Sequence, residues 1–123
     1  MNIRIAALIF GILFLGTGLA WHIPLFFDNS GLMFGYFQVD PLHNKFNIGS
    51  GLLALAAAAT SGWWCKLYFK LLGGVYVLLG ILGFILSDQF MAMQINDSDS
   101  ILHIVIGVVA LLIGYRMQVR AGE

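Results

Sequence analysis

The chain has 123 residues, of which 60% are hydrophobic and only 10% are charged. A soluble globule of this size needs far more polar surface, so the composition excludes most soluble folds and predicts one integral membrane domain over residues 1–123. The net charge of zero argues against a nucleic-acid partner, because neutralising phosphates requires a basic face. The single cysteine, Cys65, excludes an intramolecular disulfide.

Residues 5–23 are uncharged and long enough, at about 1.5 Å per residue, to cross a hydrocarbon core of about 30 Å. We interpret them as the first span. Arg4, the apolar run after it and the small residues Gly18 and Ala20 also fit a secretory signal peptide, which is the less favoured alternative. Residues 24–39 combine Asp28 with many aromatic rings, which predicts an interfacial loop with a short helix lying flat over about residues 32–37.

The second span is predicted over residues 41–62, with Asp40 as N-cap and Pro41 at the first helical position, where its missing N–H costs nothing. Trp63 and Trp64 predict the next membrane interface. A third span follows over residues 67–87. The stretch from 88 to 100 is acidic and contains no lysine or arginine, and either Asp97 or Asp99 can cap a fourth span over residues 100–117.

The basic residues predict the orientation of these spans. Only Lys45 falls on one side of the predicted topology. On the other side lie Arg4, Lys66, Lys70, Arg116 and Arg120. Because cytoplasmic loops carry the excess of lysine and arginine, both termini are expected in the cytoplasm.

The chain also repeats itself, because the second and fourth spans align with an offset of 56 residues, placing Asn47 on His103 and Gly51 on Gly107. Small residues recur along one face of each span, where they allow close helix packing. These predicted packing seams contain Gly11, Gly18, Gly51, Ala54, Ala58, Gly73, Gly80, Gly83, Gly107, Ala110 and Gly114. The expected fold is an all-α four-helix membrane bundle built from two duplicated hairpins, related by a pseudo-two-fold axis along the membrane normal.

The motif Pro41-Leu42-His43-Asn44, together with Leu102-His103 at the start of the last span, resembles a family of small bacterial four-helix membrane proteins that is catalogued as a domain of unknown function. The resemblance covers nearly the whole chain. It implies the topology and the bacterial inner membrane, and it implies no activity. One departure is Asn47, where members of that family commonly carry a second histidine.

All three histidines, His22, His43 and His103, are expected near the outer face of the membrane. With Asn44 and Asn47 they form a candidate ligand site or interhelical polar site, and polar residues inside spans are costly enough to suggest function. Interhelical hydrogen bonding without a cofactor is the favoured interpretation, while a bound metal, haem or pigment remains open. Acidic partners within reach of such a site are Asp40, Asp88 and Asp99.

Three functions fit these observations. The first is an accessory or interaction subunit that binds another membrane protein or its own copy. The second is a module that holds a metal, haem or pigment at the outer histidines, and the third is a small transporter or channel. We do not expect an enzyme, because no nucleophile or general base with a positioned partner can be named.

Overall fold

The computed structural model describes residues 2–29, 31–36, 41–86, 97–120 and 122. These residues form four α-helices and one short 3-10 helix, and Phe27 and Met33 make an isolated β-bridge. The elements are α1 (Ile3–Ala20), η1 (Pro24–Phe26), α2 (Pro41–Thr60), α3 (Gly62–Leu86) and α4 (Asp97–Arg116). The prediction of an all-α fold is therefore confirmed.

Helix α1 begins and ends earlier than the predicted span 5–23, for local reasons. The side-chain oxygen of Asn2 accepts a hydrogen bond from the backbone N–H of Arg4 at 2.7 Å, which caps the first turn at Ile3. At the other end, Pro24 disfavours helical backbone in the residue before it, and Ile23 is extended.

Helices α2 and α3 are separated by one residue, Ser61. Pro41 is the first residue of α2, as predicted, while its predicted cap Asp40 lies outside the described residues. The Ser61 hydroxyl accepts a hydrogen bond from the backbone N–H of Trp64 at 3.4 Å, in the manner of an N-cap. Helix α3 therefore starts at Gly62, five residues before the expected start at 67, and Trp64 lies in its first turn.

The predicted short helix over about residues 32–37 is wrong for the described part of that segment. Phe34 has φ of 54° and Gly35 has φ of 81°, which is left-handed backbone that breaks a right-handed helix. The chain instead turns here and buries Met33 against the bundle. Helix α4 begins at Asp97, so Asp97 and Asp99 lie inside its first turn, where carboxylates are favourable, rather than at its cap.

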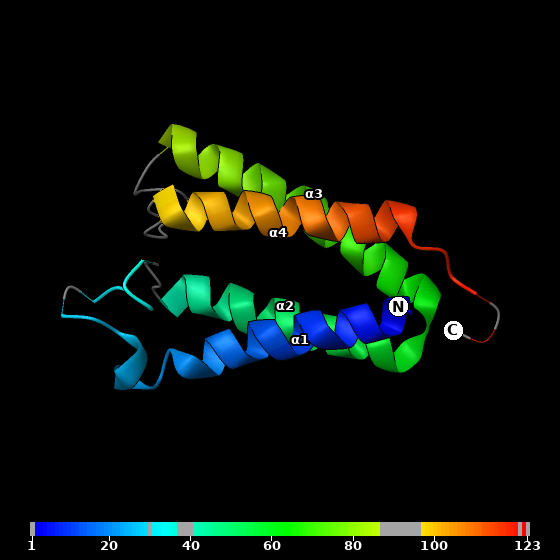
Figure 1. Ribbon diagram of the computed structural model, residues 1–123, viewed down its shortest axis with the longest axis horizontal. Helices are drawn as coiled ribbons and strands as arrows, with labels where there is room; N and C mark the ends of the chain where they lie inside the picture. Colours follow the sequence, from blue (N-terminus) through cyan, green and yellow to red (C-terminus); the bar gives the residue numbers. More distant parts are fainter. Residues whose placement is uncertain (1, 30, 37–40, 87–96, 121, 123) are drawn as a thin grey trace.

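The helices form two antiparallel hairpins, α1 with α2 and α3 with α4, and both chain termini lie at the same end of the molecule (Figure 1). Each hairpin is close-packed at a glycine crossing. A Cβ added to Gly73 would lie 2.8 Å from the carbonyl oxygen of Gly107, and one added to Gly51 would lie 3.0 Å from that of Gly11. Only glycine permits backbones to approach this closely.

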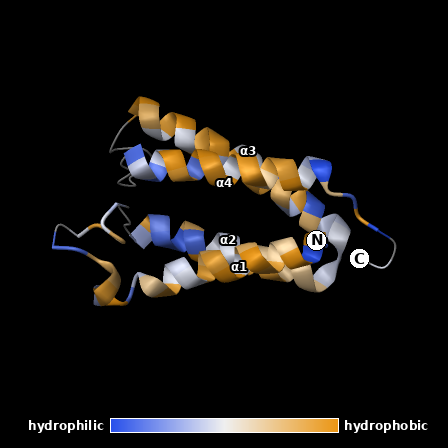
Figure 2. Cartoon of the chain, viewed as in Figure 1, coloured by the Kyte–Doolittle hydropathy of each residue, from blue (hydrophilic) through white to orange (hydrophobic). Residues whose placement is uncertain are grey.

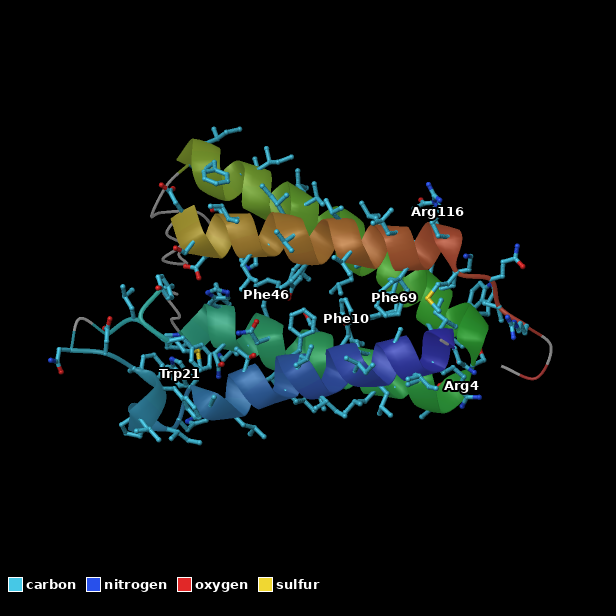
Figure 3. The ribbon with its side chains drawn as sticks, viewed as in Figure 1. Arg4, Phe10, Trp21, Phe46, Phe69 and Arg116 are labelled. Carbon is cyan, nitrogen blue, oxygen red and sulfur yellow. The ribbon has the colours of Figure 1, made fainter. Side chains whose placement is uncertain are left out.

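Aromatic rings lie between the hairpins, with Phe10 and Phe69 near the middle of the bundle (Figure 3). Phe10 of α1 meets Phe69 of α3 edge to face, with ring centroids 4.9 Å apart. Farther along, Phe14 of α1 meets Tyr76 of α3 at 5.5 Å. These contacts join the two hairpins into one bundle.

Three helices, α1, α3 and α4, are long and apolar enough to cross a membrane, which indicates a membrane protein. Helix α2 differs, because its first half is hydrophilic and its second half apolar (Figure 2). The polar residues His43, Asn44, Asn47 and Ser50 of that half are buried inside the bundle.

Candidate functional site

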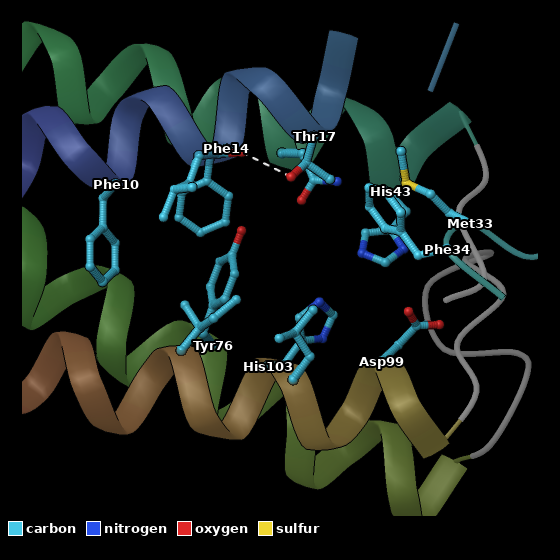
Figure 4. A pocket seen from close by; sticks show the side chains of 13 residues that line it. Phe10, Phe14, Thr17, Met33, Phe34, His43, Tyr76, Asp99 and His103 are labelled. Atoms are coloured by element: carbon cyan, nitrogen blue, oxygen red, sulfur yellow. Dashed lines mark hydrogen bonds between the residues drawn. The ribbon is translucent and has the colours of Figure 1, made fainter. Parts of the chain in front are cut away.

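The structure gathers polar side chains between the two hairpins, around a cavity of about 310 Å³. His43 reaches it from α2, and Asp99 and His103 reach it from α4 (Figure 4). Asn47 of α2 also lines it. Each pair is one helical turn apart, so both members face the same side of their helix. All four residues are buried, Asp99 with only 1% of its surface exposed.

The aromatic rings around the cavity are in mutual contact. His43 and His103 meet edge to face with ring centroids 5.3 Å apart, and Tyr76 meets His103 at the same distance. The hydroxyl oxygens of Tyr76 and Ser50 are 2.9 Å apart, and Tyr68 donates a hydrogen bond to the carbonyl oxygen of Ser50 at 2.9 Å. These bonds hold Tyr76, and through it the imidazole of His103, in a defined position.

Among the described residues, three buried side-chain polar atoms lack a hydrogen-bond partner: His103 Nδ1, Asn44 Oδ1 and Ser100 Oγ. Leaving such an atom unpaired costs about 1–3 kcal/mol. Asn44 Oδ1 lies against Gly18, 3.6 Å from the position of an added Cβ, within one hairpin. His103 is different, because its imidazole lies on the wall of the cavity, where a bound molecule can contact the ring.

The remaining wall of the cavity is apolar. Its lining includes Phe10, Leu13, Phe14, Met33, Leu102 and Ile106. Leu13 of α1 is 63% exposed and Leu102 of α4 is 38% exposed, so the cavity has an apolar rim between these two helices. A site of this kind can hold a mostly apolar molecule and orient it through a few polar atoms.

The residues predicted for the site separate into three groups. The structure brings together His43, Asn47, His103 and Asp99. It places His22 elsewhere, exposed and edge to face with Trp21 at 5.1 Å, and Asn44 against Gly18. Asp40 and Asp88 lie outside the described residues.

Sequence reasoning missed Tyr76, Ser50 and Met33 as parts of the site. Tyr76 was missed because an aromatic ring at helical spacing is normally a core residue. The available signal was its hydroxyl within an apolar span, since a buried Tyr hydroxyl needs a partner. Met33 gave no signal, because its burial depends on how the loop folds back.

The arrangement bears on the metal and haem alternatives. Within the described residues, no group of three or more His, Cys, Asp or Glu side chains is placed to hold a metal ion. The rings of His43 and His103 are in contact, so a porphyrin plane cannot lie between them in this arrangement. Among the described residues, the polar side chains that line the cavity belong to Thr17, His43, Asn47, Tyr76, Asp99 and His103, all of which can form hydrogen bonds.

A second cavity of about 460 Å³ lies between α2 and α3. It is lined mainly by apolar side chains, among them Phe46, Leu53, Leu72 and Val75. Ser50 of α2 and Tyr76 of α3 also line it. None of the described residues around it is a histidine or a charged residue. It therefore provides an apolar counterpart to the first cavity, which His43 and His103 line and which we call the histidine cavity.

Comparison with known proteins gives a family without an activity. No curated protein and no solved structure matches the chain. A family model described as a domain of unknown function, DUF4383, matches residues 4–116, which include α2, α3, α4, all of α1 after its first residue, and the histidine cavity. The chain therefore belongs to the DUF4383 family.

Proposed function

We propose that all four helices span the membrane, α2 included. Helix α2 has 20 residues, about 30 Å of helix and the thickness of the hydrocarbon core. Its low hydropathy comes from His43, Asn44, Asn47 and Ser50, which are buried and so do not meet lipid. Lys45 is exposed near the start of α2, where a lysine stem reaches the headgroups.

We further propose that the two hairpins are duplicates. Gly11 of α1 and Gly73 of α3 correspond with an offset of 62 residues, and Gly51 and Gly107 correspond with the offset of 56. Added Cβ atoms at Gly11 and Gly73 would strike Leu55 and Leu111, which are also 56 residues apart. The same crossing contact in both hairpins supports a common origin.

The proposed orientation places both termini in the cytoplasm of a bacterial inner membrane. Arg4 and Arg116 lie at the end of the bundle where the termini are, opposite Trp21 (Figure 3). Lys66 and Lys70, in the first turns of α3, belong to that same end. The excess of positive charge supports the cytoplasmic assignment.

Of the three candidate functions, the geometry favours a membrane module that binds a small molecule in the histidine cavity. The observation that carries this proposal is the imidazole of His103, which lines a cavity between the hairpins and belongs to a polar residue that is only 6% exposed. We propose binding rather than catalysis.

Native mass spectrometry of the protein, gently extracted from its own membrane, tests this proposal. We expect a stoichiometric small-molecule mass on the wild type. It should be lost from His103→Leu and kept by His22→Leu, which removes an exposed histidine away from the cavity. Absence of any added mass from the wild type, or equal retention by both variants, would contradict the proposal.

A second candidate is an accessory or self-associating subunit. It is supported by the exposed face of α1 at Gly16, where nothing lies within 4 Å of an added Cβ. Ile12 and Leu19 are exposed beside it, so a helix of another subunit can approach closely. The same spectra test it: Gly16→Leu should reduce the mass of the assembly, whereas Gly49→Leu, at another open glycine, should not.

A further inference from the structure

The charges of the lining residues limit the class of molecule that the histidine cavity can bind. Among the residues described as lining the cavity, none is lysine or arginine, and Asp99 is present. Phosphate and carboxylate headgroups are bound in proteins chiefly by basic side chains. An anionic phospholipid or a fatty acid therefore finds no cationic partner here, and an uncharged molecule fits better.

The shape of the cavity narrows the ligand further. His43, His103, Tyr76 and Phe14 present rings at steep angles to one another, with interplanar angles of 69–77° in the three contacts between them. Such walls offer both ring faces and ring edges, and a flat ring packs against them offset or edge to face. The volume of about 310 Å³ is at the lower limit for small-molecule sites, enough for a ring system without a long chain.

The polar atoms define the chemistry of the contact. Neutral imidazole donates from one nitrogen and accepts at the other. A nitrogen of the His103 imidazole that faces the cavity can therefore donate to a carbonyl oxygen or, as the other tautomer, accept from a hydroxyl. Asn47, on the facing helix and also on the cavity wall, carries both a donor and an acceptor.

The rim indicates how the ligand reaches the site. Leu13 and Leu102 are exposed on helices apolar enough to face lipid, so the cavity opens between α1 and α4 toward the bilayer. A ligand that enters from the bilayer is lipid-soluble, and its chain can remain between the two helices.

We infer that the histidine cavity binds a lipid-soluble quinone or its quinol, with a ring oxygen on the imidazole of His103 and the prenyl chain leaving between Leu13 and Leu102. This inference rests on the proposed binding function and names its ligand class. A ring with oxygens that accept as a quinone and donate as a quinol matches the two tautomers of one imidazole. No electron transfer is part of the inference.

The experiment uses the full chain in phosphatidylcholine nanodiscs, titrated with a decyl-substituted benzoquinone while tryptophan quenching and heat are recorded. Saturable binding is expected for the wild type. His103→Leu should weaken it about tenfold or more, as expected for loss of a buried hydrogen bond, and His103→Gln should restore part of it.

A pair of tryptophan variants, one at each cavity, separates blocking of the site from a general loss of folding. Leu13→Trp should block the histidine cavity, whereas Val75→Trp, at the equivalent exposed position of the second cavity, should leave the dissociation constant unchanged. Equal binding by Leu13→Trp and the wild type would overturn the inference.

Different results would refute the quinone assignment and the binding function. A native-membrane extract in which the added mass is a phospholipid or fatty acid, with no quinone binding in nanodiscs, would refute the quinone and leave the binding function standing. No added mass together with no quinone binding would refute both.

Discussion

Replacing Gly73 by alanine tests the close packing of α3 against α4 at a single methyl group. The added Cβ would lie 2.6 Å from Leu111 Cγ, 2.8 Å from the carbonyl oxygen of Gly107 and 2.8 Å from the backbone nitrogen of Leu111. The Leu111 side chain can rotate away, but two of these three contacts are backbone atoms. Restoring a separation of about 3.5 Å requires the helices to move apart by roughly 0.7 Å.

The neighbouring Gly74 supplies the matched control, because nothing lies within 4 Å of a Cβ added there. Both replacements gain helix propensity of about 1 kcal/mol. Only Gly73→Ala also carries the cost of overpacking, about 1–3 kcal/mol. We therefore expect Gly74→Ala to stabilise the protein and Gly73→Ala to be about 1–3 kcal/mol less stable than Gly74→Ala.

The assay is reversible unfolding of both variants in mixed micelles, followed by circular dichroism. Subtracting one variant from the other removes the shared propensity gain and leaves the packing cost. Equal unfolding free energies for Gly73→Ala and Gly74→Ala would refute the reasoning, because the backbone clash would then cost nothing.

Two further predictions concern the site and the orientation. Tyr76→Phe removes the 2.9 Å hydrogen bond to Ser50 and should lower the free energy of unfolding by about 0.6 kcal/mol, the average for such bonds between membrane helices; no change in the same unfolding assay would show that the bond contributes nothing. With a membrane-impermeant thiol reagent on intact cells, Asn29→Cys should be labelled and Gln118→Cys should not, since both are exposed at opposite ends, and native Cys65, fully buried, should stay unlabelled. The reverse labelling pattern would invert the topology.

The all-helical fold could be predicted because length and hydrophobic composition leave few other structures. Helix ends were harder to predict, since they depend on single capping contacts such as those of Asn2 and Ser61. The turn at Phe34 and Gly35 could not be foreseen, because a left-handed residue other than glycine is set by its surroundings rather than by its own preference.

The sequence predicted at which end of the bundle the site lies, but not which residues form it. Three histidines near one face followed from the order of the spans, yet which of them meet depends on how each helix is rotated about its axis. Gly51 and Gly107 set that rotation, because each glycine must face the other helix of its own hairpin. His43 and His103 therefore meet, while His22, past the end of α1, has no such constraint.

The one-residue connection between α2 and α3 has a mechanical consequence. It joins the two hairpins at the end that holds the termini, so a change in their separation is a rotation pivoting near Ser61. His43 is 17 residues before Thr60, about 26 Å along the helix. A rotation of about 3° then moves His43 relative to His103 by roughly 1.4 Å. The imidazole pair lies far from the pivot, so a molecule bound beside it can change the angle between the two hairpins.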